Sequence, residues 1–242
     1  MKYPQPRGFS RRRVQKLLSR TKSDHSAGGR IEVFSRHFLG YSYKPNPLIG
    51  SADRAEMFTA SLVGFDCVSY IETVLALARA SNVDDFIEWL RKIRYRQGRI
   101  QWECRNHYMT LWLRNNIREG LMRPISMPAV RTVSRERILN GIPGLFEQRT
   151  RVKCVPKPAM PRLAPHLRSG DLIFFVSTRK NLDVFHAGII VRDGNSILMR
   201  HASRSQGAVV EQELSGFLKA NRLAGVIVAR PREITDSAAV SN

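Results

Sequence analysis

Apolar side chains recur every three to four residues through the first half of the chain, the spacing that collects them on one face of an α-helix. Gly40 can end one such helix, and the Pro- and Gly-containing stretch 41–51 that follows is predicted to be a loop. Another apolar pattern is long enough to be a buried helix and begins close to Cys67. In all, the spacing predicts helices over residues 10–20, 30–40, 67–80, 84–95 and 107–120.

The second half of the chain has a different pattern. Prolines are frequent between residues 121 and 165 and no apolar period is sustained, so we expect irregular segments with one or two short strands, such as 131–136. After Gly170 the apolar runs become short and rich in Ile, Val and Phe, as is typical of β-strands. They predict strands over residues 171–176, 184–191, 196–202 and 225–231. Helices first and antiparallel strands later predict an α+β fold.

Composition adds one unusual feature, which is the charge. The 242 residues are 43% hydrophobic and 25% charged, as in ordinary soluble globular proteins, so extensive disorder is not expected. The length requires no more than one main domain. Forty Lys and Arg face twenty Asp and Glu, and the formal charge of +20 favours a polyanionic partner. Nucleic acid, an anionic membrane surface and an acidic cell-wall polymer all fit that description.

The cysteines give neither a disulfide framework nor a thiolate zinc site. Cys67, Cys104 and Cys154 are widely spaced and form no CxxC pair. We therefore predict no metal and no cofactor, and we interpret Cys104 and Cys154 as structural.

The amino-terminal segment is basic but has no apolar h-region or cleavage site, and no apolar run is long enough to span a membrane. Three explanations stay open: a cytoplasmic protein, export by a route without this signal, or numbering that begins after a removed leader. The localisation and the oligomeric state are left unassigned.

Cys67 is the first candidate for chemistry because it precedes the buried helix. The exposed amides and the positive dipole end at a helix start favour a thiolate over a thiol. A cysteine nucleophile also needs a base, usually His, and a third group that orients the imidazole. Taken alone, a cysteine in an apolar helix is more often a small core residue.

Two of the six histidines fit the remaining roles. His186 opens the segment HAGIIV and His201 closes ILMRH, on two predicted strands joined by a turn at Asp193-Gly194. Antiparallel pairing would bring both rings to the same end of the hairpin, within reach of a helix that starts at Cys67. A histidine on a strand is usually structural or exposed. The case for catalysis therefore rests on Cys67, His186 and His201 together and not on any one of them.

The segments FDCVSYIETVLAL, GDLIFF, HAGIIV and RHAS, in this order, resemble the NlpC-type cell-wall cysteine peptidase superfamily, which has a papain-like fold. The segments SRHFLGYSYKPNPLIG and IRYRQGRIQWECRNHYMTLWLRNN resemble its N-acetylmuramoyl-L-alanine amidase-like branch, long catalogued as a domain of unknown function. The resemblance implies a papain-like domain over residues 30–232, a basic arm over 1–29 and a flexible tail over 233–242. It also implies N-terminal helices packed on a C-terminal antiparallel sheet or half-barrel.

The resemblance further implies a reaction and its residues. Cys67 would be the nucleophile, His186 the base and His201 the orienting residue in the hydrolysis of a bacterial peptidoglycan amide bond. That bond is either the N-acetylmuramoyl-L-alanine bond or a γ-D-glutamyl bond of the stem peptide. Tyr43 would lie near the thiol, with Tyr41 as a competing assignment. Members of this family usually carry an export signal or a lipoprotein leader, and none is visible here.

Two charged residues have both a substrate-binding and a structural interpretation. Asp66 binds the free amine of a substrate or, as we favour, caps the helix. Arg105 binds a carboxylate of the stem peptide or is a solvated charge at a helix end.

Two other classes of function stay open. One is a papain-like hydrolase or acyltransferase acting on a substrate other than peptidoglycan, because function depends on the pocket and not on the fold. The other is a basic nucleic-acid-binding protein without enzymatic activity. The latter is disfavoured because no nucleic-acid-binding motif or interleaved aromatic pattern accompanies the charge.

Overall fold

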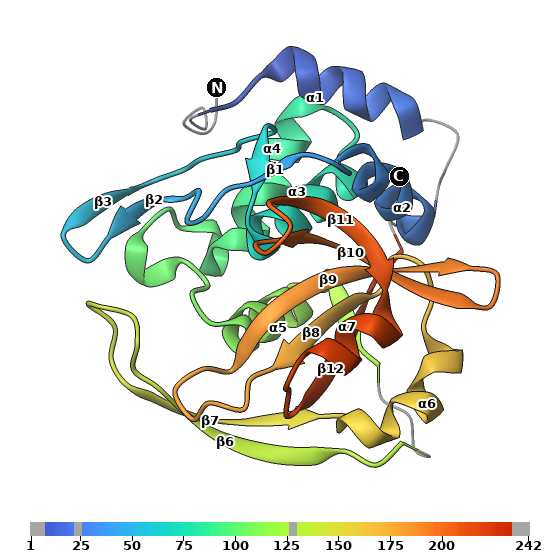
Figure 1. Cartoon of the computed structure of the whole chain (residues 1–242). Coiled ribbons are helices and arrows are strands. Elements are labelled where there is room, and N and C mark those ends of the chain that lie inside the picture. Colours follow the sequence, from blue (N-terminus) through green and yellow to red (C-terminus); the bar gives the residue numbers. More distant parts are fainter. Residues whose placement is uncertain (1–7, 22–25, 126–129, 234–242) are drawn as a thin grey trace, which may run out of the picture.

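The structure is a computed structural model that describes residues 8–21, 26–125 and 130–233 (Figure 1). Its helices are α1 (Arg11–Leu18), α2 (Ala27–His37), α3 (Cys67–Arg79), α4 (Val83–Arg94), α5 (Met109–Arg118), α6 (Met160–Leu163) and α7 (Leu214–Ala220). Short 3-10 helices lie between them: η1 (Ser19–Thr21), η2 (Arg96–Gly98), η3 (Trp102–Cys104), η4 (Lys157–Ala159) and η5 (Ala164–His166). The helices predicted from apolar spacing are confirmed, and their ends lie within about three residues of the predicted ones.

The strands are β1 (Ser42–Tyr43), β2 (Ile49–Ser51), β3 (Arg54–Met57), β4 (Gly64–Phe65), β5 (Met122–Pro124), β6 (Val133–Leu139), β7 (Gln148–Cys154), β8 (Leu172–Val176), β9 (Val184–Asp193), β10 (Ser196–Ser203), β11 (Ala208–Glu213) and β12 (Gly225–Pro231). The strands predicted after Gly170 are confirmed. The loop predicted over 41–51 is only partly right, because β1 and β2 lie within it. Strands of two or three residues are too short to produce an alternating pattern.

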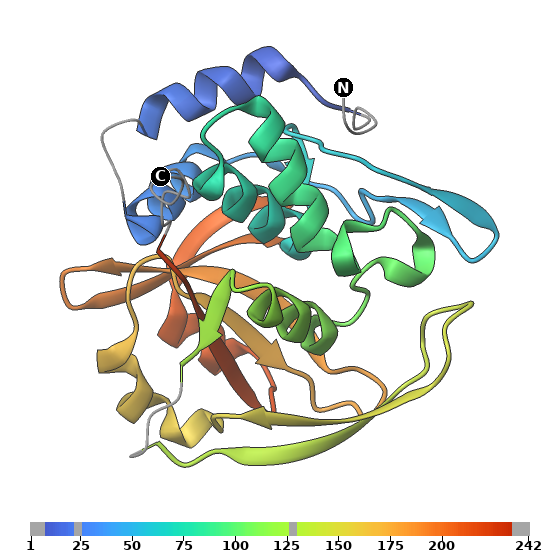
Figure 2. The same cartoon turned by 180° about the vertical axis from the view of Figure 1, so that it is seen from behind.

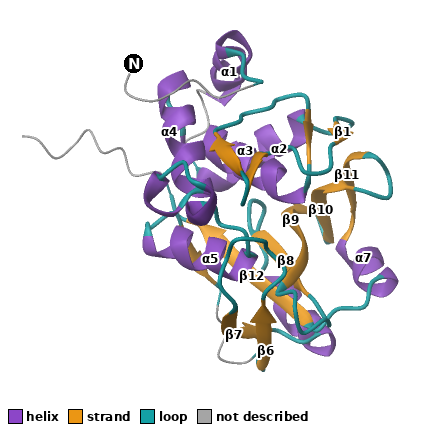
Figure 3. Ribbon diagram, turned by 90° about the vertical axis from the view of Figure 1, so that its left-hand side faces the viewer, coloured by secondary structure: helices purple, strands orange, loops and turns teal. Residues whose placement is uncertain are grey.

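In the described part of the chain, eight strands form one sheet in the order β4-β1-β11-β10-β9-β8-β12-β5. The sheet curls into a half-barrel, and the helices α1 to α4 lie together on one side of it (Figure 3). The fold is therefore α+β, as predicted. Two further pairs, β2-β3 and β6-β7, stand outside this sheet as hairpins.

Strand β8 explains how the core is divided. Its five residues are all buried, so its sequence LIFFV shows no alternation. Leu172 and Phe174 belong to the core that the sheet shares with the helices α1 to α5, whereas Ile173 and Phe175 belong to a second core beneath α6 and α7. Both faces of the sheet are covered, and the strands that carry the candidate histidines are held from both sides.

The structure describes only parts of the predicted arm 1–29 and of the predicted tail 233–242. Helix α1 lies within the predicted arm 1–29, and its Val14, Leu17 and Leu18 are buried in the main core. Of the predicted tail 233–242, residues 234–242 lie outside the described residues. The described part of the chain has no helix with the length and apolar character needed to cross a bilayer.

A buried ion pair ties the helix α3 to its neighbours. Arg94 of α4 donates from Nε to Glu72 Oε2 at 2.7 Å, and each side chain is 2% exposed. Trp112 of α5 donates from Nε1 to the other oxygen of Glu72 at 3.1 Å, and Arg94 also donates to the carbonyl of Thr59 at 2.5 Å. Buried charges need such complete pairing. The pair therefore fixes α3 against α4 and α5.

Candidate active site

Helix α3 begins at Cys67, as the sequence predicts, and Asp66 is its N-cap. The Asp66 carboxylate accepts a hydrogen bond from the Ser69 backbone N–H at 2.7 Å, and the Asp66 N–H donates to the Ser69 hydroxyl at 3.0 Å. This reciprocal capping box stabilises the first turn and fixes the direction in which Cys67 projects. Of the two interpretations of Asp66, the cap is the one with direct contacts.

The two candidate histidines are in contact. His186 Nε2 lies 2.6 Å from His201 Nδ1, although the residues are on different strands. Strands β9 and β10 are antiparallel and pair from Ser196↔Asp193 to Arg200↔Ile189, with Gly194 at a φ of 54° in the turn. The hairpin thus brings both rings to one end, as its turn signal predicts.

The pairing of β9 with β10 stops before it reaches His186 and His201. Beyond Arg200↔Ile189 the register of β9 with β10 stops, while β10 continues to Ser203 in pairing with β11. The backbone N–H of Ala187, next to His186, is turned instead toward the Cys67 thiol and acts on its pKa as a hydrogen-bond donor. The Cys67 thiol therefore lies close to β9, near the point where the pairing of β9 with β10 stops.

Aromatic side chains enclose the histidine pair. The Phe217 ring of α7 stacks on His186 with centroids 5.5 Å apart and meets His201 edge-on at 5.7 Å. Phe175 of β8, which is paired with His186 across the sheet, packs on Phe217 at 4.4 Å. The pair is shielded from water on this side.

Burial dominates the electrostatics of the site. It raises the pKa of the Cys67 thiol to about 12, with a further rise from Asp66, while the N–H groups of Ala187, Cys67 and Val68 act in the opposite direction. Burial also lowers the pKa of His186 to about 3, aided by His201, and that of His201 to about 4. The helix-start amides act as predicted, but burial outweighs them, so the resting thiol and both imidazoles are neutral.

Acid is expected to destabilise the fold through His201. An unfolded imidazole takes up a proton near pH 6.5, whereas folded His201 does so near pH 4. Between these values the unfolded chain binds more protons, so the free energy of unfolding falls as the pH falls below about 6.5. In urea titrations at about pH 7.5 and about pH 5, His201→Asn should lose less stability than the wild type, by roughly 1–2 kcal/mol. Equal losses in the two proteins would contradict this origin of the acid sensitivity.

Of the two tyrosines, Tyr43 is the one whose pKa responds to the charge of Cys67. The pKa of Tyr43 is raised by burial and by the neighbouring Cys67 and Asp66, and the guanidinium of Arg204 acts in the opposite direction. Tyr41 instead packs edge-on against Phe38 with centroids 5.3 Å apart, and its hydroxyl lies 3.3 Å from His37 Nε2.

Arg105 belongs to a different cluster. It donates to Glu56 Oε1 at 3.2 Å, and its guanidinium lies 4.3 Å from the centre of the Trp102 ring. Its side chain is 13% exposed and Glu56 is almost fully buried, so Arg105 is a paired charge and not a solvated one. None of the interactions found among the described residues joins Arg105 to Cys67, His186 or Tyr43.

Cys104 and Cys154 are buried, and both are free thiols, as is the half-buried Cys67. Cys154 packs with Val152 and Val176 in a small apolar cluster. Within the described ranges, no group of three His, Cys, Asp or Glu side chains is arranged to hold a metal ion.

Sequence reasoning missed three contributors to the site: the Ala187 amide, Arg204 and Phe217. Arg204 directly follows the segment RHAS, and this closeness in the chain is the one signal that could have found it. Ala187 lies within the segment HAGIIV, but the sequence does not show that its amide is near Cys67, and Phe217 has no sequence signal because its position depends on how α7 packs.

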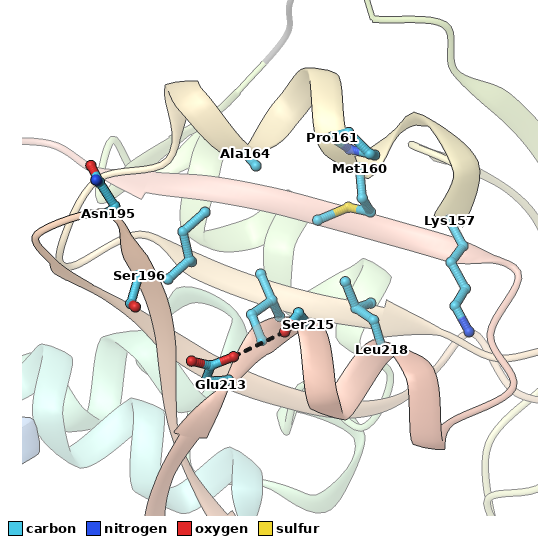
Figure 4. A pocket seen from close by; sticks show the side chains of 11 residues that line it. Lys157, Met160, Pro161, Ala164, Asn195, Ser196, Glu213, Ser215 and Leu218 are labelled. Atoms are coloured by element: carbon cyan, nitrogen blue, oxygen red, sulfur yellow. Dashed lines mark hydrogen bonds between the residues drawn. The ribbon is translucent and has the colours of Figure 1, made fainter.

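A hollow of about 470 Å³ lies beside α7 but apart from the histidines (Figure 4). Met160 of α6 and Leu218 of α7 point toward it, and Glu213 accepts a hydrogen bond from the Ser215 hydroxyl at 3.1 Å at its edge. None of the candidate catalytic residues lines it. This hollow is therefore separate from the candidate catalytic residues.

The family model described as N-acetylmuramoyl-L-alanine amidase-like matches residues 33–226. No curated protein matches the sequence.

Solved structures share the fold over most of the chain. A Legionella pneumophila protein of the family DUF1460 is 22% identical with a TM-score of 0.82, and the match covers 92% of this chain and 95% of that one. An N-acetylmuramoyl-L-alanine amidase from Bacteroides uniformis is 25% identical with a TM-score of 0.76, covering 86% and 99%. A proposed xylanase from Bacteroides fragilis is 26% identical with a TM-score of 0.70, covering 81% and 98%. Since these names differ, the substrate has to be argued from the site.

Proposed function

The chain belongs to the N-acetylmuramoyl-L-alanine amidase-like family, and from this premise we propose that it is a cysteine hydrolase acting on bacterial peptidoglycan. The bond cleaved is an amide, either between the muramoyl lactyl group and L-alanine or at γ-D-glutamate in the stem peptide. The observation that carries the proposal is the 2.6 Å contact of His186 with His201, beside the amide that faces Cys67. The B. uniformis amidase of similar fold supports the choice of substrate.

We also propose that the domain is a papain-like member of the NlpC-type superfamily. The proposal rests on the order of the motifs DC, HAGI and RHAS and on the elements that carry them. A helix that begins at Cys67 packs against a half-barrel whose antiparallel strands β9 and β10 carry the two histidines. This arrangement supplies nucleophile, base and orienting residue from rigid elements, which hold catalytic geometry better than loops do.

In the first step the thiol proton passes to His186 while the sulfur attacks the carbonyl carbon. For His186 to accept it at Nδ1, its own proton must be at Nε2 and be donated to His201 Nδ1, an assignment consistent with the 2.6 Å contact. His201 is then protonated at Nε2, which is buried and without a protein partner among the described residues. His201 acts as the positioning residue because it fixes both the tautomer and the ring plane of His186.

The burial of the site determines when the thiolate forms. With a thiol pKa of about 12 and a His186 pKa of about 3, charge separation in the resting enzyme is unfavourable. Proton transfer therefore accompanies attack on the carbonyl, and His186 serves as a general base and not as one half of a preformed ion pair.

The tetrahedral intermediate then places its oxyanion at the start of α3. The Cys67 N–H and the Tyr43 hydroxyl are the donors we assign to it. His186 returns the proton to the departing amine, leaving a thioester on Cys67. A water molecule activated by His186 hydrolyses that thioester and frees the thiol.

Digestion of purified sacculi and muropeptides tests the substrate. Cleavage at L-alanine releases intact stem peptides with a free alanine amine, whereas γ-D-glutamyl cleavage leaves a shortened peptide on the sugar, and the two fragment masses differ. We expect one of these products from the wild-type protein. Hydrolysis of a model thioester or ester without release of either fragment would instead favour a substrate other than peptidoglycan.

A further inference from the structure

The hairpin β6-β7 exposes a phenylalanine at its tip. Phe146 is 93% exposed, whereas the other exposed large apolar residues in the described chain, Val33 and Val63, are 37% and 46% exposed. The tip is anchored, because Gly141 N–H donates to the Tyr108 hydroxyl at 3.0 Å and Trp102 Nε1 donates to the Pro143 carbonyl at 3.1 Å. Phe146 is therefore presented to the surroundings by a fixed loop.

The same hairpin carries a row of cations on its outer face. Arg149, Arg151 and Lys153 alternate along β7 with residues of the opposite face, and all three are exposed. Arg149 and Arg151 have acidic neighbours at 3.4 Å, Glu147 and Glu136. Exposed pairs of this kind contribute little free energy, so the cations are available to a stronger anionic partner.

A groove beside the hairpin continues this basic surface. It has a volume of about 470 Å³ and lies between α5, β7 and β12, with Arg114 and Arg118 of α5 across from Arg151 and Lys153. Apolar residues also line it, among them Leu113 and Ile117 of α5 and Ile227 of β12. Figure 2 shows α5 above the β6-β7 hairpin. Cations thus border an apolar groove and an exposed aromatic tip.

We propose that this surface, formed by the β6-β7 hairpin and the groove beside α5, binds an anionic lipid bilayer. The cations would contact the headgroups, and Phe146 would enter the boundary between headgroups and acyl chains. Attraction to anionic lipids combined with buried apolar area is how peripheral proteins bind membranes. A nucleic acid or a wall polymer would use the cations but offers no apolar phase for Phe146, so the lipid surface accounts for both features. The proposal is independent of the reaction assigned to Cys67.

Co-sedimentation with vesicles tests the proposal on the full-length protein. Binding is expected to vesicles containing phosphatidylglycerol, weakly or not at all to pure phosphatidylcholine, and to decrease as salt is raised. The double variant Arg151→Gln/Lys153→Gln should bind about 25-fold more weakly, at about fivefold per cation. Phe146→Ser should also weaken binding, and this loss should persist at high salt, because it removes apolar contact.

The control variants remove exposed cations or an exposed apolar side chain outside the proposed surface. Lys16→Gln/Lys219→Gln removes two exposed cations outside the surface, and Val63→Ser removes another exposed apolar side chain. Equal weakening by the hairpin variants and these controls would overturn the proposal. So would hairpin-dependent binding to isolated wall polymer or to nucleic acid with no binding to the vesicles. Hydrolysis of soluble muropeptides should be unchanged in all these variants, which separates this test from that of the catalytic assignment.

Discussion

Replacing Cys67 with alanine is expected to reduce muropeptide hydrolysis by roughly 10⁴-fold or more, because no other thiol can form the acyl-enzyme. The capping box of α3 is made by Asp66 and Ser69, so the helix should begin at the same residue in the variant. The melting temperature should change little. Product release measured by mass analysis, together with a thermal melt, checks both expectations.

A second cysteine variant tests whether the loss of activity is specific to Cys67. Cys104→Ala removes a buried thiol that lies near Gln101 and Arg96, not near the histidines, and it should keep near wild-type activity. Full activity of Cys67→Ala would show that the nucleophile is another residue. Loss of activity in both variants would point to damage of the fold.

His186→Ala is expected to be as inactive as the cysteine variant, since burial keeps the thiol protonated and nothing else is assigned to accept its proton. His201→Ala should lose less, roughly 10²-fold, because it removes the partner that orients His186 but leaves the base. The measurement is kcat on a defined muropeptide. A restored rate in His201→Asn, which keeps a hydrogen-bond acceptor, would support the positioning role.

The histidine comparison also has an internal control. His166 is exposed, and none of the interactions found among the described residues joins it to His186 or His201, so His166→Ala should be fully active. Equal retention of activity by His186→Ala and His201→Ala would exclude both from the catalytic apparatus. The cysteine would then need a base that the present assignment does not contain.

The sequence predicts the long elements well because their patterns are long. The run LIFFV and the hairpin turn at Asp193-Gly194 are sufficient to predict β8, β9 and β10, and the repeat after Cys67 predicts α3. Strand β1 and the helix α7 leave no such pattern. Each is short and is held in place by tertiary contacts, which the spacing of apolar residues in the sequence does not reveal.

Some features of the candidate site can likewise be predicted from local sequence, whereas others depend on tertiary packing. His186 and His201 are linked by a hairpin, so local geometry is enough to predict that they meet. The choice between Tyr43 and Tyr41 depends on how β1 and the start of α3 come together. The net effect on the Cys67 pKa depends on the depth of burial, which the dipole of a helix start does not reveal.

The ion pair between Glu72 and Arg94 has a consequence for how this family diverges. Removing one partner would leave the other charge buried without compensation, at a cost of about 3–5 kcal/mol, whereas replacing both with apolar residues can be nearly neutral. A protein in which only one of the two residues has been replaced is therefore destabilised. The residues at positions 72 and 94 are expected to covary among homologues. The evolutionary freedom of the thiol-bearing helix is limited by an arginine on another helix.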